Sequence, residues 1–194
     1  ITKGTLIERD IDILSELASM DLCSVAISVP TMDDELKRIM EPRVPAATAR
    51  LRTIEKLAGA DVPVSALLAP VIPAINDNEI ESILTAVADA GARQAHYIFL
   101  RLPHEVKDIF SEWLQVHFPD RAARVMGLVR EASGGRDYDN RFGIRQTGRG
   151  PYADMLGKRF RAACRRYGLD TGRRETALDC SRFDPPGQQQ LGLF

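Results

Sequence analysis

The groups best suited to do chemistry stand near the ends of short apolar segments. Lys3 provides an ammonium, Ser28 a hydroxyl and Arg101 a guanidinium, and each lies at or near the end of a run of β-forming residues. Ligands of parallel α/β folds bind at the carboxyl ends of the strands, so we expect these groups to share one site. Together they could hold a carboxylate, a ribose or a polar edge of a substrate.

One predicted strand, residues 94–102, should add an aromatic group to this site. Alternation along the strand is expected to turn Ile98 and Leu100 towards covering helices. Tyr97, Phe99 and Arg101 would then face the interior of the fold, where Tyr97 could contact a substrate. The alternative for Tyr97 is an ordinary core aromatic residue.

A glycine-rich segment, residues 134–150, combines arginines with aromatic side chains. Guanidinium groups bind phosphates and aromatic rings stack on bases, so this combination is typical of nucleic-acid recognition. A ferredoxin or another acidic protein could use the same surface. The arginines expected to contact nucleic acid are Arg136, Arg141, Arg145 and Arg149, and the interleaved rings are those of Tyr138, Phe142 and Tyr152.

The net charge of −1 conceals two oppositely charged parts. Residues 1–120 contain 11 Lys and Arg against 19 Asp and Glu, whereas residues 121–182 contain 15 against 7. Such an excess of positive charge in the second part favours an anionic partner. The alternative is that this basic surface pairs with the acidic part of the same chain.

The cysteines and histidines do not form a recognisable ligand set. Cys23, Cys164 and Cys180 are far apart and lack CxxC or CxxxCxxC spacing. We therefore expect reduced thiols in a cytoplasmic protein, and no metal site in this chain. No apolar run approaches the ~20 residues that a membrane-spanning helix needs, and the N-terminus lacks the pattern of a signal peptide. A membrane partner is therefore not expected.

Apolar and amphipathic segments alternate along the first part of the chain. Strands are expected near 23–29, 62–72 and 94–102, and helices near 5–19, 33–40, 47–58, 80–91 and 105–117. This order predicts an α/β fold with parallel strands, as an open sheet or as part of a barrel. We divide the chain into βα units (1–118), a basic helical extension (119–170) and a flexible C-terminal tail (171–194).

A series of short motifs runs through the chain in a fixed order. The motifs are Ile1-Thr2-Lys3, Val25–Val29 (VAISV), Glu41–Arg43 (EPR), Ala69–Pro73 (APVIP), Asn76-Asp77, Tyr97–Pro103 (YIFLRLP), Gly134–Arg145 (GGRDYDNRFGIR) and Gly150–Tyr152 (GPY). The series resembles the back half of radical S-adenosylmethionine (SAM) proteins. Within that superfamily it is most similar to the spore photoproduct lyase-like branch, which is related to DNA repair photolyases.

The resemblance implies the C-terminal part of a partial (βα)6 barrel in a radical SAM iron–sulfur enzyme. In that family a [4Fe–4S] cluster on a CxxxCxxC loop cleaves SAM to a 5′-deoxyadenosyl radical. An electron donor such as a flavodoxin or a ferredoxin is also implied. By resemblance, Lys3 would contact the SAM carboxylate and Ser28 the ribose, and Pro70 and Val71 would line the adenine. Tyr97 would relay a hydrogen atom or contact the substrate.

The sequence departs from the family at the cluster. The CxxxCxxC loop and the first strands of the barrel are not in this sequence, which starts at Ile1 without an initiator Met. We therefore expect the chain to be a fragment of a longer enzyme, and to bind no cluster and catalyse nothing alone.

The last five residues form a second recognisable motif. Gln190-Leu191-Gly192-Leu193-Phe194 is similar to the QLxLF peptide with which bacterial repair and replication proteins bind the sliding clamp. Leu191, Leu193 and Phe194 would supply apolar anchors, and Gln190 an amide for hydrogen bonds. The alternative is that this tail folds back on its own domain.

The leading hypothesis is therefore a radical SAM enzyme that acts on nucleic acid, such as a DNA-repair lyase. A non-catalytic module that binds DNA or the sliding clamp is the first alternative. A radical SAM enzyme that modifies a protein or a small molecule is the second.

Overall fold

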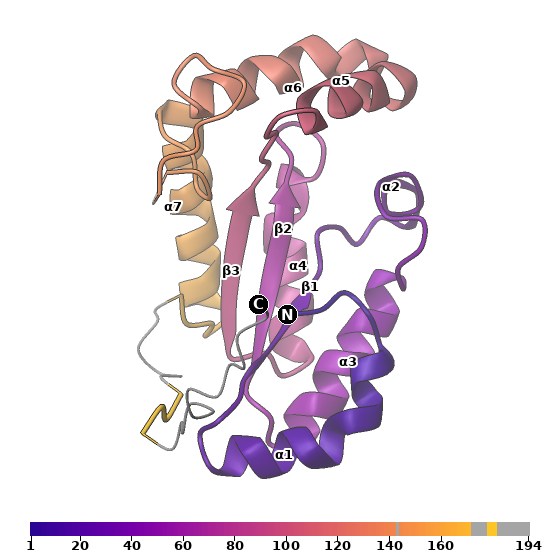
Figure 1. Cartoon of the computed structure of the whole chain (residues 1–194), viewed down its shortest axis with the longest axis vertical. Coiled ribbons are helices and arrows are strands. Elements are labelled where there is room, and N and C mark those ends of the chain that lie inside the picture. The colour runs from indigo at the N-terminus through magenta and orange to yellow at the C-terminus, as the bar shows by residue number, and fades with distance from the viewer. Residues whose placement is uncertain (143, 172–177, 182–194) are drawn as a thin grey trace, which may run out of the picture.

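A short parallel sheet lies at the centre of the molecule, seen here in a computed structural model that describes residues 1–142, 144–171 and 178–181. The strands β1 (Val25–Ser28), β2 (Val64–Val71) and β3 (Gln94–Phe99) lie side by side in chain order (Figure 1). Both neighbouring pairs are parallel. Parallel strands in chain order must be joined by crossovers, which here are helical.

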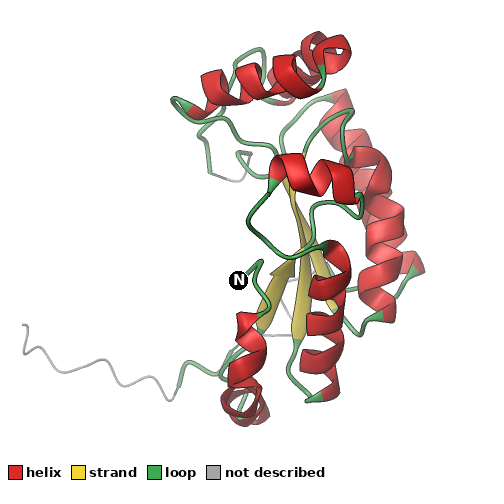
Figure 2. Ribbon diagram, turned by 90° about the vertical axis from the view of Figure 1, so that its right-hand side faces the viewer, coloured by secondary structure: helices red, strands yellow, loops and turns green. Residues whose placement is uncertain are grey.

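The helices cover one face of this sheet and extend across its upper end, whereas the N-terminus lies on the opposite face (Figure 2). The α-helices are α1 (Ile11–Ser19), α2 (Asp34–Met40), α3 (Ala47–Gly59), α4 (Ile80–Asp89), α5 (Val106–His117), α6 (Pro119–Ala132) and α7 (Pro151–Arg166). Two 3₁₀ helices, η1 (Leu6–Asp10) and η2 (Asp77–Glu79), precede α1 and α4. One face of the sheet is therefore free of covering helices within the described part of the chain.

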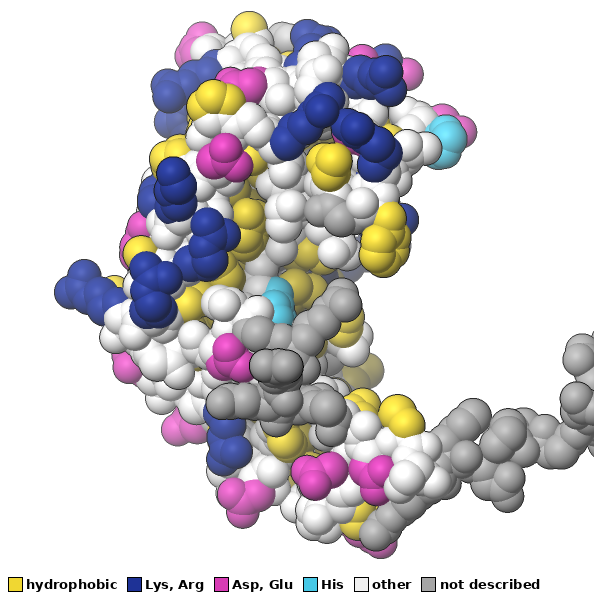
Figure 3. All heavy atoms as spheres, turned by 90° about the vertical axis from the view of Figure 1, so that its left-hand side faces the viewer, with side chains coloured by type: hydrophobic (Ala, Val, Ile, Leu, Met, Phe, Trp, Pro, Cys, Tyr) yellow, Lys and Arg dark blue, Asp and Glu magenta, His cyan; other side chains and the backbone are white. Residues whose placement is uncertain are grey.

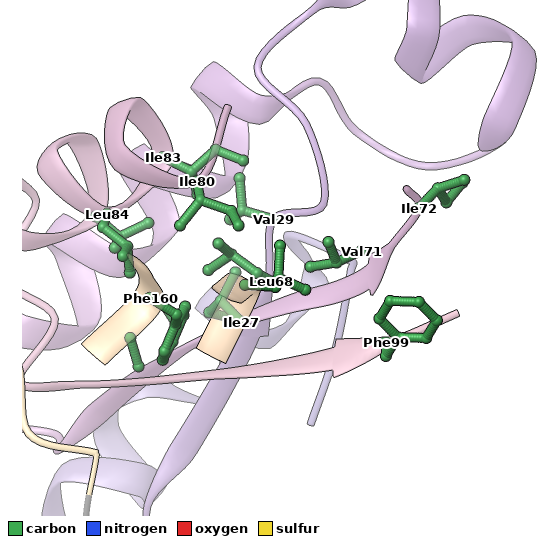
Figure 4. Packing of buried hydrophobic residues seen from close by; sticks show 14 of the residues in the cluster. Ile27, Val29, Leu68, Val71, Ile72, Ile80, Ile83, Leu84, Phe99 and Phe160 are labelled. Atoms are coloured by element: carbon green, nitrogen blue, oxygen red, sulfur yellow. The ribbon is translucent and has the colours of Figure 1, made fainter. Parts of the chain in front are cut away.

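The core lies between the sheet and the helices on its covered face. Ile27 of β1 and Leu68 of β2 point into this layer, where they meet Ile80 and Leu84 of α4 and Phe160 of α7 (Figure 4). Each of these side chains is almost fully buried. Burying a side chain of this size contributes roughly 1.5–3 kcal/mol, so this layer is the main source of stability.

Both borders of the sheet are partly covered by other segments of the chain. At the β3 border, Phe99 N donates to the Gln146 carbonyl at 2.7 Å and Ala95 N donates to the Asp170 carbonyl at 3.0 Å. At the β1 border, Thr2 forms an isolated parallel bridge with Ile27. The residues after α6 and after α7 thus cover the outer border of β3, while the first residues of the chain lie beside β1.

The predicted fold class is confirmed, since the protein is a mixed α/β structure whose open parallel sheet fits a partial barrel. Several details differ from the predictions. β1 and β2 are shorter than the strands expected near 23–29 and 62–72. α2 begins close to the predicted position, and Asp33 caps it because its carboxylate accepts from Glu35 N and Leu36 N.

Two further predictions concern the C-terminal motif and the absence of membrane-spanning helices. The predicted clamp-binding residues Gln190, Leu191, Leu193 and Phe194 lie outside the described residues. None of the helices in the described ranges is long and apolar enough to cross a membrane.

Candidate functional site

A cavity of about 480 Å³ opens at the carboxyl ends of the strands on the uncovered face. Four of the residues singled out from the sequence line it, namely Lys3, Ser28, Pro70 and Arg101. Leu67, Ile98 and Leu100 add apolar surface. A cavity of this size, mostly apolar with a few convergent polar groups, is typical of a site for a small molecule or cofactor.

Val71 does not line this cavity, although the resemblance placed it beside the adenine. Its side chain is almost fully buried in the core. Strict alternation would turn Val71 to the open face with Leu67 and Ala69, but the register of β2 shifts between Leu68 and Val71, and Val71 is buried instead.

Three charged side chains at the rim of the cavity are linked by ion pairs. Glu41 forms ion pairs with Lys3 through one carboxylate oxygen and with Arg50 through the other, at 2.6 Å. Arg50 is only 2% exposed, and its guanidinium also donates to the Ser28 carbonyl at 2.8 Å and to the Pro45 carbonyl at 3.0 Å. Arg50 and Glu41 therefore position Ser28 and Lys3, the two polar groups on the β1 side of the cavity.

The balance of forces on Glu41 favours its charged form. Burial raises the pKa of the Glu41 carboxyl, but hydrogen bonds from Lys3 and Arg50 lower it more, so that it lies below its ordinary value. Because Glu41 stays ionised at neutral pH, the ammonium of Lys3 is held in place at the cavity wall.

Ser28 offers its hydroxyl to the cavity. Its Oγ donates to the Ala69 carbonyl at 3.2 Å, which fixes the side chain and leaves the oxygen lone pairs as acceptors. The residue is 2% exposed, so a ligand at this position would be largely shielded from water.

The predicted inward direction of Tyr97 is wrong. Its ring packs against Phe160 of α7, with ring centroids 4.9 Å apart, and its partner in the sheet is the helix-facing Leu68. Ile98 faces the cavity instead. The helix that covers this part of β3 is α7, and its Gly157 leaves room for the Tyr97 hydroxyl, since a Cβ there would lie 3.2 Å from that oxygen. Burial raises the pKa of Tyr97, and its role as a relay or substrate contact remains a prediction.

Arg101 follows β3, whereas Lys3 lies beside β1, so the two residues line opposite sides of the cavity. Its Nη2 donates to the Tyr138 hydroxyl at 2.9 Å, and its guanidinium carbon is 5.8 Å from the centroid of the Tyr138 ring. Tyr138 belongs to the arginine-rich loop between α6 and α7. The loop and the cavity are thus neighbours in space, which the sequence did not reveal.

Three of the four predicted arginines of that loop have defined contacts with other residues of the loop. Arg141 forms an ion pair with Asp139 at 2.5 Å, and this contact lowers the pKa of the Asp139 carboxyl strongly. Arg145 lies 4.9 Å from the centroid of the Phe142 ring. The Arg149 guanidinium packs against Gly134, where a Cβ would collide with it.

Unpaired positive charge covers one side of the molecule. Lys and Arg side chains gather over the upper part of the face formed by α6, α7 and the loop between them (Figure 3). Within the described ranges, several have no ion pair; these are Arg136, Arg145, Lys158, Arg161, Arg165 and Arg166. A surface of this kind attracts polyanions.

Sequence reasoning missed the structural role of Arg50. A signal was present, because Arg50 belongs to a stripe with Ala47, Ile54 and Leu57, which all face the core. An arginine on the apolar face of a helix must find buried acceptors, and such acceptors lie at the end of a neighbouring strand.

Comparison with known proteins bears on the same part of the chain. Residues 1–87 match the Radical SAM superfamily model. The matched residues include Glu41, Arg50 and seven of the eleven residues that line the cavity, whereas residues 98–101 lie beyond the match.

Relatives extend this similarity beyond the matched residues. The uncharacterized protein Rv2578c of Mycobacterium tuberculosis is 33% identical over 132 residues, covering 67% of this chain and 39% of the relative. The uncharacterized protein ORF301 of Acidianus two-tailed virus is 30% identical over 109 residues, covering 54% of this chain and 35% of the relative. The chain therefore spans about two fifths of the length of these relatives or less.

Radical SAM proteins use SAM and a [4Fe–4S] cluster, and the two groups fit this chain differently. The cavity has the size and the polar groups for SAM, because Ser28 presents a shielded hydroxyl and Lys3 an ammonium. Pro70 and Leu67 provide an apolar wall suitable for adenine. The residues present therefore fit SAM.

The cysteines do not fit the cluster. The described residues contain no group of three or more side chains that could hold a metal ion. Burial raises the pKa of Cys23 and raises that of Cys164 to about 11, which disfavours the thiolates that iron needs. Cys180 is exposed and lies beyond α7.

Proposed function

We propose that this chain forms the SAM-binding and substrate-facing part of a radical SAM iron–sulfur enzyme that acts on nucleic acid. The observation that carries the proposal is the cavity at the carboxyl ends of the strands, which borders residues matched by the superfamily model and the arginine-rich loop. A cluster-bearing segment elsewhere in the intact protein would complete the site.

In this proposal each residue of the rim has a defined task. Ser28 accepts a hydrogen bond from the SAM ribose, and Lys3 contacts the SAM carboxylate while Glu41 aligns its ammonium. Arg50 keeps the end of β1 in place by bonding the Ser28 carbonyl. Bound SAM would supply the radical that abstracts a hydrogen atom from the substrate, as is general for the superfamily.

The choice of nucleic acid rests on the second half of the site. The arginine-rich loop contacts Arg101 through the hydroxyl of Tyr138. The same loop carries cations without ion pairs and the exposed aromatic ring of Phe142. Backbone phosphates and unstacked bases are the groups that such a surface recognises. A DNA-repair lyase in the cytoplasm is the specific form of this proposal, with a flavodoxin or ferredoxin as the electron donor.

The decisive experiment uses the protein encoded by the complete reading frame that contains this chain. Purified without oxygen and given SAM and a reductant, it should release 5′-deoxyadenosine. Ser28→Ala should weaken SAM binding about three- to tenfold, the value of one neutral hydrogen bond. Ser19→Ala, which removes an exposed hydroxyl at the end of α1, is the matched control and should bind SAM normally.

Failure of SAM binding and cleavage in the wild-type protein would refute the enzyme proposal. If that protein still bound DNA with a steep salt dependence, it would be a non-catalytic DNA-binding module. If it cleaved SAM but did not bind nucleic acid, its substrate would be a protein or a small molecule.

Docking on a sliding clamp through Gln190, Leu191, Leu193 and Phe194 is a separate proposal. Deleting residues 190–194 should abolish binding to a purified clamp while SAM binding stays unchanged. Unchanged clamp binding after the deletion would refute it.

A further inference from the structure

A guanidinium without a negatively charged partner lies at the edge of the cavity. Arg101 has a buried Nε that lacks a hydrogen-bond partner, and among the described residues no carboxylate forms an ion pair with it. Among the described residues, the guanidinium donates a hydrogen bond to the neutral hydroxyl of Tyr138. Buried donors without acceptors are rare in folded proteins because each one costs free energy, so this group is suited to an external acceptor.

The position of this guanidinium is fixed by the loop that follows α6. The Tyr138 hydroxyl accepts from Nη2 at 2.9 Å, and the Tyr138 ring lies near the guanidinium face. The same loop is bound to the end of β3, because Phe99 N donates to the Gln146 carbonyl at 2.7 Å. Arg101 is therefore pre-aligned, which reduces the entropy lost when a ligand binds.

Geometry and charge together indicate the class of ligand. Arginine recognises carboxylates and phosphates through its planar fork of donors. The loop that carries Tyr138 also carries Arg136 and Arg145, and Arg161 of α7 lines a neighbouring cavity together with Ile98. None of these three arginines forms an ion pair among the described residues. Several unpaired cations on the elements that border the cavity suit a chain of phosphates better than a single carboxylate.

The cavity also indicates the form of the nucleic acid. A cavity of about 480 Å³ cannot admit a duplex, so a nucleotide that reaches its mouth must be unpaired. The ring of Phe142 is 85% exposed and available for stacking on an unpaired base.

We propose that Arg101, positioned by Tyr138, binds a backbone phosphate of single-stranded nucleic acid at the mouth of the cavity. The phosphate contact places the adjacent nucleotide at the mouth of the cavity on the side of Leu100 and Arg101, and the side of Ser28 and Lys3 is left to SAM. This inference rests on the proposed function only in taking nucleic acid as the substrate.

The test measures binding of the complete protein to a fluorescent single-stranded DNA of about 12 nucleotides, a length within the usual range of binding sites, at several salt concentrations. Arg101→Ala should weaken binding about tenfold and reduce the slope of log K against log salt by about 0.7, since one phosphate contact is lost. Arg52→Ala, an exposed arginine of α3, is the matched control and should change neither quantity.

Two conservative variants separate charge from alignment. Arg101→Lys should keep the salt slope but still lose affinity, because an ammonium lacks the planar fork. Tyr138→Phe should lower the affinity about threefold at an unchanged slope, since it removes the aligning hydroxyl and keeps every charge. Either variant also keeps the test valid if Arg101→Ala does not fold.

A wild-type protein that binds the DNA while Arg101→Ala and Arg101→Lys retain its affinity and slope would overturn the inference. So would a loss of SAM binding, measured by equilibrium dialysis, without a loss of DNA binding, because the guanidinium would then serve the SAM carboxylate. Neither assay requires SAM cleavage, so failure of the enzyme proposal would be recognised separately.

Discussion

The βα units and the basic extension use arginine in opposite ways. In the βα units, Arg50 is buried and donates to two backbone carbonyls and to the Glu41 carboxylate. In the extension, Arg161 and Arg165 of α7 are exposed, and neither forms an ion pair among the described residues. The hydrogen-bond acceptors near an arginine, rather than the residue type, therefore decide whether it stabilises the fold or is available to a ligand.

The two parts neutralise each other at few points. Arg159 of α7 forms a two-pronged ion pair with Glu81 of α4, and within the described residues it is the one basic group of the extension to pair with an acidic group of the βα units. Tyr152 donates to Asp77 at 2.5 Å nearby. Arg130 and Arg141 pair within the extension, and most of its other described cations form no ion pair, so pairing between the two parts accounts for little of their opposite charge.

The largest expected effect tests the structural arginine. Arg50→Ala should lower the free energy of unfolding by about 3–5 kcal/mol, because it leaves the buried Glu41 carboxylate with only Lys3 as a partner. Arg165→Ala should change it by less than about 0.5 kcal/mol. Urea denaturation of both variants measures the difference, and similar values for the two would erase the contrast between the parts.

The next prediction concerns whether the βα units and the basic extension unfold together. Leu84 of α4 and Leu156 of α7 are both fully buried, and replacing either with Ala should lower the free energy of unfolding by about 2–5 kcal/mol. Trp113, the single tryptophan, lies in α5 and reports on the βα units by its fluorescence. We expect Leu156→Ala to shift this fluorescence transition as well. If Leu156→Ala shifted the unfolding transition seen by circular dichroism but not the one seen by Trp113 fluorescence, α7 would unfold independently of the βα units.

A smaller effect concerns the dependence of stability on pH. Glu41 has a pKa below its ordinary value of about 4.3 in the folded protein. Its contribution to stability is therefore complete above that value and is lost as the pH falls through the lower folded pKa. Glu41→Gln should have a flatter acid limb than the wild-type protein, with each unit of pKa difference worth about 1.4 kcal/mol.

Thermal denaturation between neutral pH and about one unit below the ordinary glutamate value would measure this limb. Glu55→Gln, at an exposed position of α3, is the control and should keep the wild-type slope. An unchanged slope in Glu41→Gln would mean that Lys3 and Arg50 do not stabilise the charged form.

The smallest effect tests the contact between the parts. Glu81→Gln should cost less than about 1 kcal/mol, because both partners of the ion pair with Arg159 are about one third exposed or more. High salt should reduce this cost further. A loss of several kcal/mol in urea denaturation would show that this ion pair, rather than apolar packing, joins the extension to the βα units.

The sequence predicted the location of the cavity but not all of its walls. Lys3, Ser28 and Arg101 were found because parallel strands bring their carboxyl ends together. The direction of Tyr97 was not predictable, since alternation alone cannot tell which face a helix covers, and α7 begins more than 50 residues later in the chain. The contact between Arg101 and Tyr138 also depends on how a long loop returns to the sheet.

The two outer borders of the sheet, beside β1 and beside β3, differ in the backbone hydrogen bonds that they already form. Among the described residues, Gln146 and Asp170 accept hydrogen bonds from backbone donors of β3, whereas beside β1 only Thr2 is paired. A further strand can therefore extend the sheet beside β1, while at β3 it would first have to displace the segments of Gln146 and Asp170.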